Sequence, residues 1–509
     1  MEICLTNKVV KQIITVNRML NLLNLPKSIK HRPLYDRQKI TSRIVHLGFG
    51  AFHRAHQALL TDRLLNKGNS DWGICEVNIV GGEELINEIR KQDHLYTVLE
   101  KGVTSKEAFI IGSVKESLLA PTDGIDAILE KMTDPVVEIV SLTVTEKGYC
   151  MLPSGAGLDL NNALIKADLA NPTKPMSAPG VIVEALYRRM QRGLKSFTAL
   201  SCDNIPENGL VLKKAILGLA NARDPQLATW IESNTTFPCT MVDRIVPAAT
   251  SETLTEIEDT LGGMFDPCGI ACEPFIQWVI EDNFVTNRPN WNEVGAEFVD
   301  NVVPYEEMKL RMLNGSHSFL AYLGYLAGYE HINDCMNDVN YKKATLALMM
   351  QQQAPTLHVP DHVNLQEYAD KLIERFSNPS LKHKTWQIAM DGTQKLPQRM
   401  LDSIRWHIKN GSDFSLLALG VAGWMRYVGG IDDNNQPIDI RDPMREQLQQ
   451  IVNSSTDGIE RINQLFMLQD IFGSDLPTSS LFKEKVTEYY LSLMQNGAKQ
   501  TVNHYVLSN

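Results

Sequence analysis

The order of apolar and polar positions divides the chain into two regions. In the first region, short runs of apolar and β-branched residues alternate with stretches of helical periodicity, a pattern typical of a parallel sheet whose strands are connected by helices. A Pro-rich stretch at 171–180 predicts a loop within this region. The strand-like runs, each with the turn or polar end that closes it, are 43–50, 72–79, 136–146 and 197–204.

The periodicity changes after the stretch 288–292, which contains Pro289 and marks a boundary. Beyond it, apolar residues recur three and four positions apart and the strand patterns fade. We therefore predict that the second region is mostly α-helical. The predicted helices are 310–328, 341–353, 365–376, 416–428 and 481–495.

The first predicted strand ends in the turn Gly48-Phe-Gly50, and helical periodicity continues to Asn66. Glycines allow a tight turn and a close approach to a pyrophosphate, while the start of a helix provides unpaired N–H groups and the positive end of its dipole. His53 stands where Gly-x-Gly-x-x-Gly would have its third glycine, so a purely structural turn is the alternative. We predict an α/β fold, with a Rossmann-like nucleotide-binding domain at 41–300 after an extension at 1–40, and an α-helical domain at 301–509.

Polar residues follow the later strands, as in parallel sheets whose strand ends face a cofactor. Glu76 in the second strand is a candidate for holding a ribose hydroxyl, with Glu83 and Glu84 as alternatives. Thr145 lies at the polar end of the third run and Asn204 at the polar end of the fourth. Each carboxylate could instead be solvated, and each strand could simply enter a polar loop. Two such strands after a glycine turn favour a nucleotide site.

Lys309, Asn314 and His317 place an amine, a carboxamide and an imidazole on one predicted helix. At about 100° per residue they fall within an arc of roughly 140°. Such groups can exchange a proton, stabilise an oxygen that gains charge and hold a hydroxyl, although a solvated surface helix is the alternative. Tyr305 precedes Lys309 with the Tyr-x-x-x-Lys spacing of short-chain dehydrogenases, but the pair comes late and opens a helical region. We expect Lys309 to be the acid/base and Tyr305 to be structural.

Composition narrows the class of partner. Of the 509 residues, 43% are hydrophobic and 21% are charged, which indicates a globular chain and argues against disorder. The 49 Lys and Arg residues against 60 Asp and Glu give a net charge of -11, which disfavours nucleic acid and anionic membranes. A small molecule is the expected partner, and it can be anionic if its pocket is cationic. The protein is expected to be a monomer or a small homo-oligomer.

No apolar run approaches the ~20 residues that span a bilayer. The apolar stretch 13–25 is interrupted by polar residues and lacks a cleavage site, so we expect a soluble cytoplasmic protein. Translation could begin at Met19 rather than Met1, which would make the first residues dispensable. The eight cysteines are expected to be reduced. Cys268 and Cys272 lack a second ligand pair, so we expect no zinc.

With these residues in place, the chain resembles the long-chain mannitol dehydrogenase family, the polyol-specific long-chain dehydrogenases, from about Ser42 into the C-terminal region. Stretches 141–150 and 386–395 are most similar to its fructuronate reductase branch, also called mannonate oxidoreductases. The motifs that carry the resemblance are Gly48-Phe-Gly50-Ala-Phe-His53, Thr145-Glu146-Lys-Gly-Tyr149, Ser201-Cys-Asp203-Asn204, Met241-Val-Asp243-Arg244, and Lys309 with Asn314 and His317.

The resemblance implies a role for each matching residue, without a metal. Lys309 matches the general acid/base, Asn204 and Asn314 match amides that stabilise the alkoxide-like oxygen, and His317 matches a contact to a substrate hydroxyl. Asp243 matches a substrate contact, although it could instead form an ion pair with Arg244. Further matches are substrate contacts at Asp243 and Lys395, carboxylates for a proton relay at Glu146 and Glu306, and NAD contacts at Gly48, Phe49, Gly50, Ala51, Phe52, Glu76 and Thr145. Glu306 could also be a solvated carboxylate of a first helical turn.

One position departs from the family pattern. Mannitol-oxidising members carry an arginine upstream of the lysine that matches Lys395, whereas this chain has Gln387. The departure puts simple hexitols in doubt as substrates. A uronate needs a cation for its carboxylate, and Lys395, Arg399 and Arg311 are the candidates, unless they are ordinary surface charges.

The resemblance implies an NAD-dependent enzyme that interconverts a keto sugar acid and its hydroxy acid, with D-fructuronate and D-mannonate as the expected pair. A neutral pair such as mannitol and fructose is the alternative within the same scaffold. An alternative of another class is a nucleotide-binding sensor without catalysis, but loss of the lysine or the amides would be expected there, and all are present.

Overall fold

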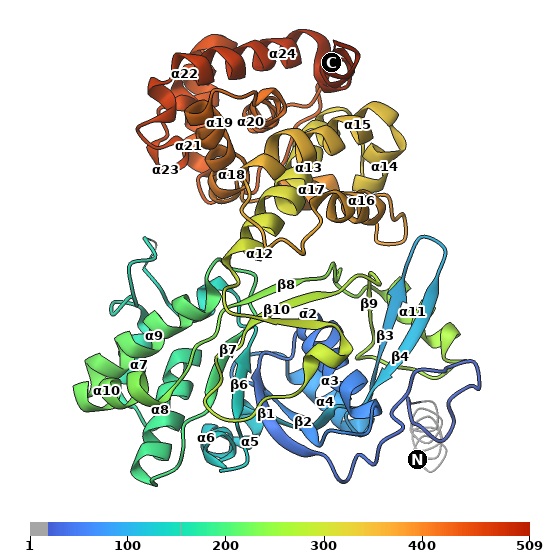
Figure 1. Ribbon diagram of the computed structural model, residues 1–509, viewed down its shortest axis with the longest axis vertical. Coiled ribbons are helices and arrows are strands. Elements are labelled where there is room, and N and C mark those ends of the chain that lie inside the picture. The colour runs from blue at the N-terminus through green and yellow to red at the C-terminus, as the bar shows by residue number, and fades with distance from the viewer. Residues whose placement is uncertain (1–18, 153, 509) are drawn as a thin grey trace, which may run out of the picture. The chain divides into compact units, whose positions relative to one another are not determined.

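The computed structural model describes residues 19–152 and 154–508. The chain folds as two compact units, of which the first ends at Val302 and the second begins at Val303 (Figure 1). The choice between Met1 and Met19 as the start concerns residues outside the described part. Among the described residues, no helix is both long and apolar enough to cross a membrane.

A five-stranded parallel sheet forms the centre of the N-terminal unit (Figure 1). Its order, β5-β2-β1-β6-β7, adds two strands on one side of β1 and then two on the other. This is the order of a Rossmann half, so the predicted fold is confirmed, and its switch point lies between β1 and β6. The strands are β1 Thr41–Leu47, β2 Trp72–Asn78, β5 Val114–Leu119, β6 Ile139–Leu142 and β7 Thr198–Ser201.

Alternation along β1 explains why its apolar run is continuous. Ile44 belongs to one buried core, whereas Val45 and Leu47 belong to the other. Successive side chains of a strand point to opposite faces, so a sheet with helices on both faces must be apolar on both. The first core includes helices α2 Ala51–Ala55, α3 Gln57–Asn66 and α4 Glu83–Lys91, and the second includes α6 Ile125–Thr133, α8 Ala178–Gln191, α9 Asn208–Arg223 and α10 Pro225–Asn234.

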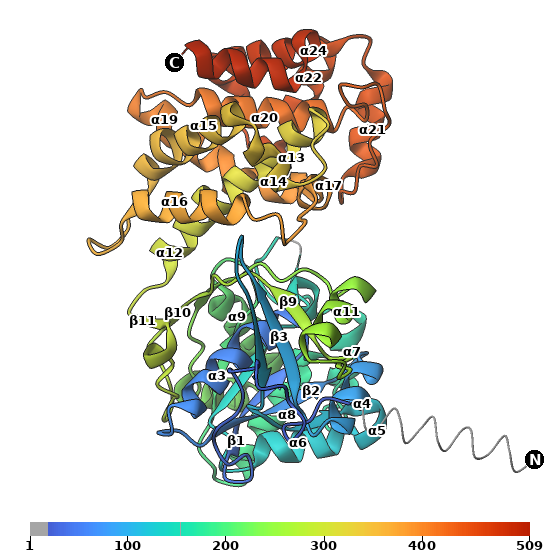
Figure 2. The same cartoon turned by 90° about the vertical axis from the view of Figure 1, so that its right-hand side faces the viewer.

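Two smaller sheets complete the unit, and the apolar pattern had not predicted them. Strands β3 and β4 form an antiparallel pair that lies side by side in Figure 1, and β9 joins β3 in parallel (Figure 2). These strands are short, so their alternation is weak in the sequence. Their bounds are β3 Tyr96–Lys101, β4 Lys106–Ile111 and β9 Ile270–Cys272; the other sheet contains β8 Thr240–Asp243, β10 Gln277–Glu281 and β11 Ala296–Val299. The remaining helices are α5 Ala120–Asp123, α7 Ala163–Ala170 and α11 Ser251–Thr260.

The described part of the predicted N-terminal extension packs into this unit. Leu20, Leu25 and Ile29 are buried in a core with residues of β3 and α11. The main-chain N–H of Leu20 also donates to the oxygen of Phe265 at 3.1 Å. These three residues of the predicted extension are therefore part of the unit's core.

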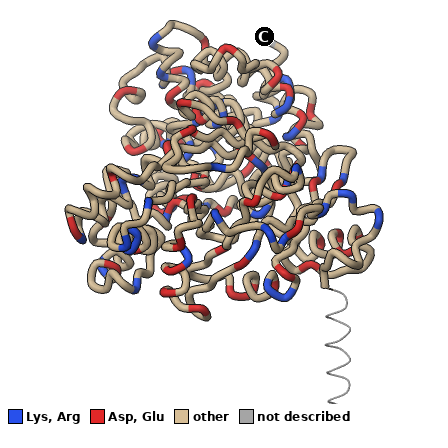
Figure 3. The backbone as a smooth tube through the Cα atoms, turned by 60° about the horizontal axis from the view of Figure 1, so that its bottom comes forward, with Lys and Arg blue, Asp and Glu red and all other residues tan. Residues whose placement is uncertain are grey.

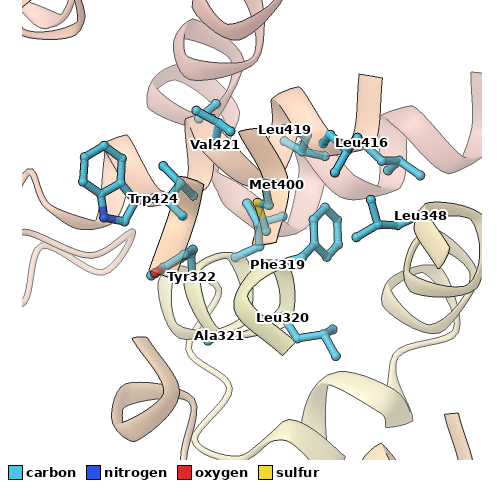
Figure 4. Close-up of a cluster of buried hydrophobic side chains, with 14 of the residues drawn as sticks. Phe319, Leu320, Ala321, Tyr322, Leu348, Met400, Leu416, Leu419, Val421 and Trp424 are labelled. Atoms are coloured by element: carbon cyan, nitrogen blue, oxygen red, sulfur yellow. The ribbon is translucent and has the colours of Figure 1, made fainter. Parts of the chain in front are cut away.

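The C-terminal unit is α-helical, as predicted. Figure 4 shows its core, in which Phe319 of α13 faces Met400 and Leu416 and Leu419 of α20. Its helices are α12 Val303–Met308, α13 Ser316–Leu326, α14 Ile332–Asn337, α15 Val339–Ala347, α16 Leu365–Phe376, α17 Thr385–Ala389, α18 Gly392–Leu396, α19 Asp402–Asn410, α20 Ser415–Tyr427, α21 Arg445–Ser454, α22 Gly458–Phe466, α23 Gln469–Phe472 and α24 Ser480–Ser508. Three π-helical segments, Lys309–Gly315, Leu348–Gln353 and Pro397–Leu401, interrupt this pattern.

Three local predictions differ from the structure. The helix predicted from Ala51 is broken at His56, whose dihedral angles (φ -124°, ψ -93°) are not helical, so α2 has only five residues. The predicted loop at 171–180 ends at Ser177, which caps α8, and Pro179 lies in the first helical turn, where its missing N–H costs nothing. The last helix is longer than predicted and contains a non-helical residue at Gly497.

Charged residues of both signs are interspersed along the backbone of each unit (Figure 3). The excess of acidic residues is therefore spread over the chain, which is not divided into an acidic and a basic half. A backbone view of this kind does not show how buried basic side chains are grouped.

Candidate functional site

The glycine turn lies at the switch point of the Rossmann sheet. Gly48 has φ +107°, and a Cβ there would lie 2.4 Å from the main-chain oxygen of Thr143, so only glycine fits. The Thr143 hydroxyl donates to the Gly48 oxygen at 3.0 Å, and the Phe49 N–H donates to Asn78 Oδ1 at 2.9 Å. These bonds hold the turn between the carboxyl ends of β1, β2 and β6.

Gly50 is different, because no close packing in this structure requires a glycine there. Its φ is not positive, and a Cβ would meet only the Gly48 oxygen at 3.8 Å. Space therefore remains open beside the turn, followed at once by the start of α2 at Ala51, with Phe52 one residue further. The arrangement fits a pyrophosphate that approaches the main chain closely.

The structure does not support Glu76 as the ribose-binding residue. Its side chain is 0% exposed, and Oε1 lies 2.7 Å from Nε2 of His53, which is also 0% exposed. Burial raises the pKa of Glu76 to about 8 and lowers that of His53 to about 3, so the neutral forms are favoured. A carboxyl group sealed in the core cannot reach a ligand. The alternatives Glu83 and Glu84 are exposed at the start of α4.

A buried carboxylate organises the loop after β6. Asp203 accepts the N–H groups of Val144 and Thr145 at 3.0 and 2.9 Å and the Tyr149 hydroxyl at 2.6 Å. Thr145 has φ +67°, a strained conformation that this bracing sustains. The sequence placed Asp203 and Tyr149 in motifs without a role; the structure shows that they fix the loop that carries Thr145 and Glu146.

Asn204 and Glu146 are exposed, whereas Asp243 is buried at the end of β8. The Arg244 guanidinium binds Glu100 and, at 2.7 and 3.0 Å, the Glu273 oxygen. Arg244 therefore has other partners, and the alternative of an Asp243–Arg244 ion pair is not supported within the described chain.

In the C-terminal unit, Lys309 begins a π-helical segment that ends at Gly315. Because π-helical hydrogen bonds join residues five apart, Lys309 and Asn314 lie closer to one face than in the wide arc predicted for an α-helix. Lys309 is only 6% exposed. His317 follows in the first turn of α13 and is 8% exposed.

The His317 imidazole lies among aromatic and basic groups. Its ring stacks on Phe376 at 5.0 Å and meets His383 edge-on at 4.8 Å between centroids. Burial, together with the nearby His383 and Arg399, holds the pKa of His317 well below its usual value, so the ring is neutral. Nε2 is buried and has no hydrogen-bond partner among the described residues. A substrate hydroxyl would satisfy it.

The three candidate cations differ in their partners. Arg311 donates to the Thr356 hydroxyl at 3.0 Å and to Glu307 at 3.3 Å, so it is used within the fold. Lys395 donates to the Met390 oxygen at 2.5 Å, and burial lowers its pKa to about 8. Arg399 donates to the Ser318 hydroxyl at 3.0 Å and to a main-chain oxygen.

Glu306, Tyr305 and Gln387 differ in their burial and contacts. Glu306 is buried, which argues against the alternative of a solvated carboxylate. The Tyr305 hydroxyl lies 3.2 Å from Nε2 of His362, as suits a structural residue. Gln387 is exposed. Sequence reasoning missed His383 and Phe376 beside His317, because no spacing pattern links residues that distant along the chain.

Comparison with known proteins gives consistent matches over both units. The model of the mannitol dehydrogenase Rossmann domain matches residues 42–293, and that of the mannitol dehydrogenase C-terminal domain matches residues 301–494. The D-mannonate oxidoreductase of Escherichia coli strain K12 is 60% identical over 94% of this chain and 98% of its own length.

Proteins named for mannitol are less similar. The mannitol 2-dehydrogenase of Neosartorya fischeri is 36% identical over 93% of this chain and 95% of its own length. The solved ternary complex of Pseudomonas fluorescens mannitol 2-dehydrogenase with NAD and D-mannitol is 37% identical, with a TM-score of 0.85 over 96% of this chain and 100% of that chain. Identity is thus much higher to the relative named for a sugar acid.

Proposed function

Because the chain belongs to the mannitol dehydrogenase family, we propose that it is an NAD-dependent oxidoreductase that interconverts D-fructuronate and D-mannonate. The observation that carries the choice of substrate is the 60% identity to a D-mannonate oxidoreductase, against 36–37% to mannitol 2-dehydrogenases. Gln387 supports the same choice, because the mannitol-oxidising members that this chain resembles carry arginine at that position.

The N-terminal unit supplies the features that suit NAD. The turn at Gly48 and Gly50 stands at the switch point of the sheet, and the missing side chain of Gly50 leaves its surface open. Phe49, Ala51, Phe52 and Thr145 are the further contacts that we propose. The exposed Glu83 and Glu84 replace Glu76 as candidates for the ribose. When bound, NADH would supply the hydride that reduces the keto carbon.

The protein's own groups would manage the proton and the charge on oxygen. In the reducing direction, protonated Lys309 would deliver the proton while Asn204 and Asn314 stabilise the developing alkoxide. His317 would hold a neighbouring hydroxyl through its unpartnered Nε2. Asp243 and Lys395 would add substrate contacts, and Glu146 or Glu306 would relay the proton to or from Lys309. The reverse steps would oxidise the alcohol.

Steady-state NADH oxidation with D-fructuronate, D-tagaturonate and D-fructose tests this function. We expect D-fructuronate to give the highest kcat/KM, and Lys309→Ala to lower kcat by at least about 100-fold, the usual contribution of general acid/base catalysis. Lys343→Ala is the matched control, because Lys343 is an exposed lysine of α15 in the same unit. Its kcat should equal that of the unmodified protein.

Each other result would redirect the proposal. Preference for D-fructose would identify a polyol dehydrogenase, and full activity of Lys309→Ala would remove the lysine from the mechanism. NADH binding without turnover of a broad panel of sugars and sugar acids would instead support a nucleotide sensor.

A further inference from the structure

Basic side chains gather around His317 in the C-terminal unit. The charges of His383, Arg399, Arg375 and Lys395 all lower the pKa of His317, while Asp391 and Asp442 act on Lys395, and Asp391 also acts on Arg399. We call Arg399, Lys395, His317 and His383 the basic cluster. Burying several like charges together is costly unless an anion compensates them. An anion bound at the cluster would reduce that cost.

Arg399 forms no close ion pair with a carboxylate of the described chain, although the charge of Asp391 acts on it from a greater distance. No carboxylate of the described residues lies within 4.0 Å of its guanidinium, and its hydrogen bonds come from Nη1 alone, to the Ser318 hydroxyl at 3.0 Å and the Asn314 oxygen at 3.4 Å. Nε is buried and has no partner among the described residues. One edge of the guanidinium is therefore anchored while donors on the other edge remain unused.

Arg189 shows how a buried structural arginine can have its donors satisfied by the fold. Arg189 is buried without a carboxylate, but it donates to four main-chain oxygen atoms, from Met132, Asp134, Val137 and Lys195. Its donors are thus largely satisfied by the fold. Nε of Arg399 is not, and because Nε of Arg426 and of Arg461 is also unpartnered, the unused donor points to a ligand only together with the neighbouring Lys395 and His317.

Lys395 adds a second cation one helical turn before Arg399. Its pKa is lowered by burial and, next in size, by the charge of Arg399, so the two cations are electrostatically close. Lys395 Nζ lies 3.8 Å from the nearest Asp391 oxygen, and the charges of Asp391 and Asp442 offset part of this repulsion. A carboxylate shared by Lys395 and Arg399 would relieve their repulsion.

The cluster is also adjacent to the segment that carries the proposed acid/base. Arg399 bonds to the main chain of Asn314, which stands one π-helical turn after Lys309. In D-fructuronate the carboxylate is four carbons from the keto carbon, a span comparable to one helical turn. A molecule of that length can place one end near each group.

We propose that Arg399, assisted by Lys395, binds the substrate carboxylate and selects sugar acids over neutral ketoses. The inference rests on the proposed function and deepens it. D-Fructuronate has a carboxylate at the end of the molecule where D-fructose has a hydroxymethyl group. Comparing the two substrates therefore isolates this contact. A forked guanidinium suits a planar carboxylate better than an ammonium group does.

The test compares kcat/KM for these two substrates in Arg399→Gln, Arg399→Lys and Arg311→Gln. We expect Arg399→Gln to lower the fructuronate-to-fructose ratio by roughly 10- to 100-fold, mainly through KM, as for a lost charge-assisted hydrogen bond. Arg399→Lys keeps the charge but not the fork and should fall between. Arg311→Gln removes the rival candidate and should leave the ratio unchanged.

Binding of D-mannonate and D-mannitol to the NADH complex, measured by calorimetry, gives the same ratio if D-fructose turns over too slowly. A wild-type ratio in both Arg399 variants would overturn the inference while leaving the proposed function intact. Should Arg399→Gln fail to fold, Arg399→Lys decides alone. If the unmodified protein does not reduce D-fructuronate, the proposed function fails instead, which is a distinct result.

Discussion

Single residues of the same type take opposite roles here according to their burial. Glu76 and His53 are sealed from solvent and bonded to one another, whereas Glu83 is exposed. The ring of His46 stacks on that of His53 at 3.4 Å between centroids, and its nitrogen atoms bond to the hydroxyl groups of Ser141 and Thr143. This polar network supports the strands beneath the glycine turn. The network therefore serves as a stabilising part of the core.

The Glu76–His53 pair predicts a loss of stability at alkaline pH. Burial raises the pKa of Glu76 from 4.5 to about 8 and lowers that of His53 from 6.5 to about 3. Between pH 6.5 and 8 the folded pair therefore holds one proton, on Glu76, whereas in the unfolded chain both side chains are deprotonated. A state that binds more protons loses stability as pH rises, here by about 2 kcal/mol between pH 6.5 and 8. In Glu76→Gln, which cannot titrate, this part of the decline should vanish. Urea unfolding at pH 6 and pH 8.5 measures it.

Glu83→Gln is the control, since the exposed Glu83 should leave the pH dependence as it is. Parallel stability curves for Glu76→Gln and the unmodified protein would show that the pair does not retain a proton.

At the scale of elements, the π-helical segments set the spacing of the catalytic candidates. The segment Lys309–Gly315 packs against Pro397–Leu401, and this approach is possible because Gly315 has no side chain. A Cβ there would lie 2.6 Å from the Arg399 oxygen and 2.5 Å from Gln353 Nε2. One glycine thus allows segments from three parts of the sequence to meet.

Gly315→Ala is expected to destabilise the C-terminal unit despite alanine's better helix propensity. The main-chain oxygen of Arg399 cannot yield cheaply, and overpacking of this kind costs about 1–3 kcal/mol. Thermal unfolding should show a lower Tm, and kcat/KM for the sugar acid should fall with it. Gly157→Ala, where no atom lies within 4 Å, is the control. An unchanged Tm for Gly315→Ala would mean that the segments can separate without cost.

At the scale of the whole molecule, we propose that cofactor binding and acid/base chemistry are divided between the two units. The N-terminal unit holds the glycine turn and the strand ends, while the C-terminal unit holds Lys309 and the basic cluster. We retain the domains 41–300 and 301–509 as the proposed functional division. The net charge of -11 belongs to the chain as a whole, so a basic cluster inside one unit is compatible with an anionic substrate.

Hydrogen exchange with and without NADH tests this division. Since a ligand stabilises the state that binds it, by about 2.7 kcal/mol at 100 times Kd, protection should appear at the glycine turn and in the loop after β6. Amides of α20 in the helical core should exchange at unchanged rates. Protection confined to the helical unit would contradict the assignment of NAD to the N-terminal unit.

The sequence by itself determined the fold class and the family, because these depend on local patterns. Continuous apolar strands, a glycine turn and a later change to helical periodicity are each visible within a short window. The motif around Lys309 and Asn314 was likewise local. Short strands such as β8 and β9 escaped notice, since their stability comes from partners far along the chain.

Only the tertiary structure decided which charged residues are available for chemistry. The sequence could not separate Glu76 from Glu83, or Arg399 from Arg311, because burial and pairing depend on contacts distant in sequence. Folding placed Glu76 against His53 and Arg311 against Thr356, and it left Nε of Arg399 without a hydrogen-bond partner among the described residues. The ionisation and availability of a side chain are properties of its surroundings, and those surroundings exist only after folding.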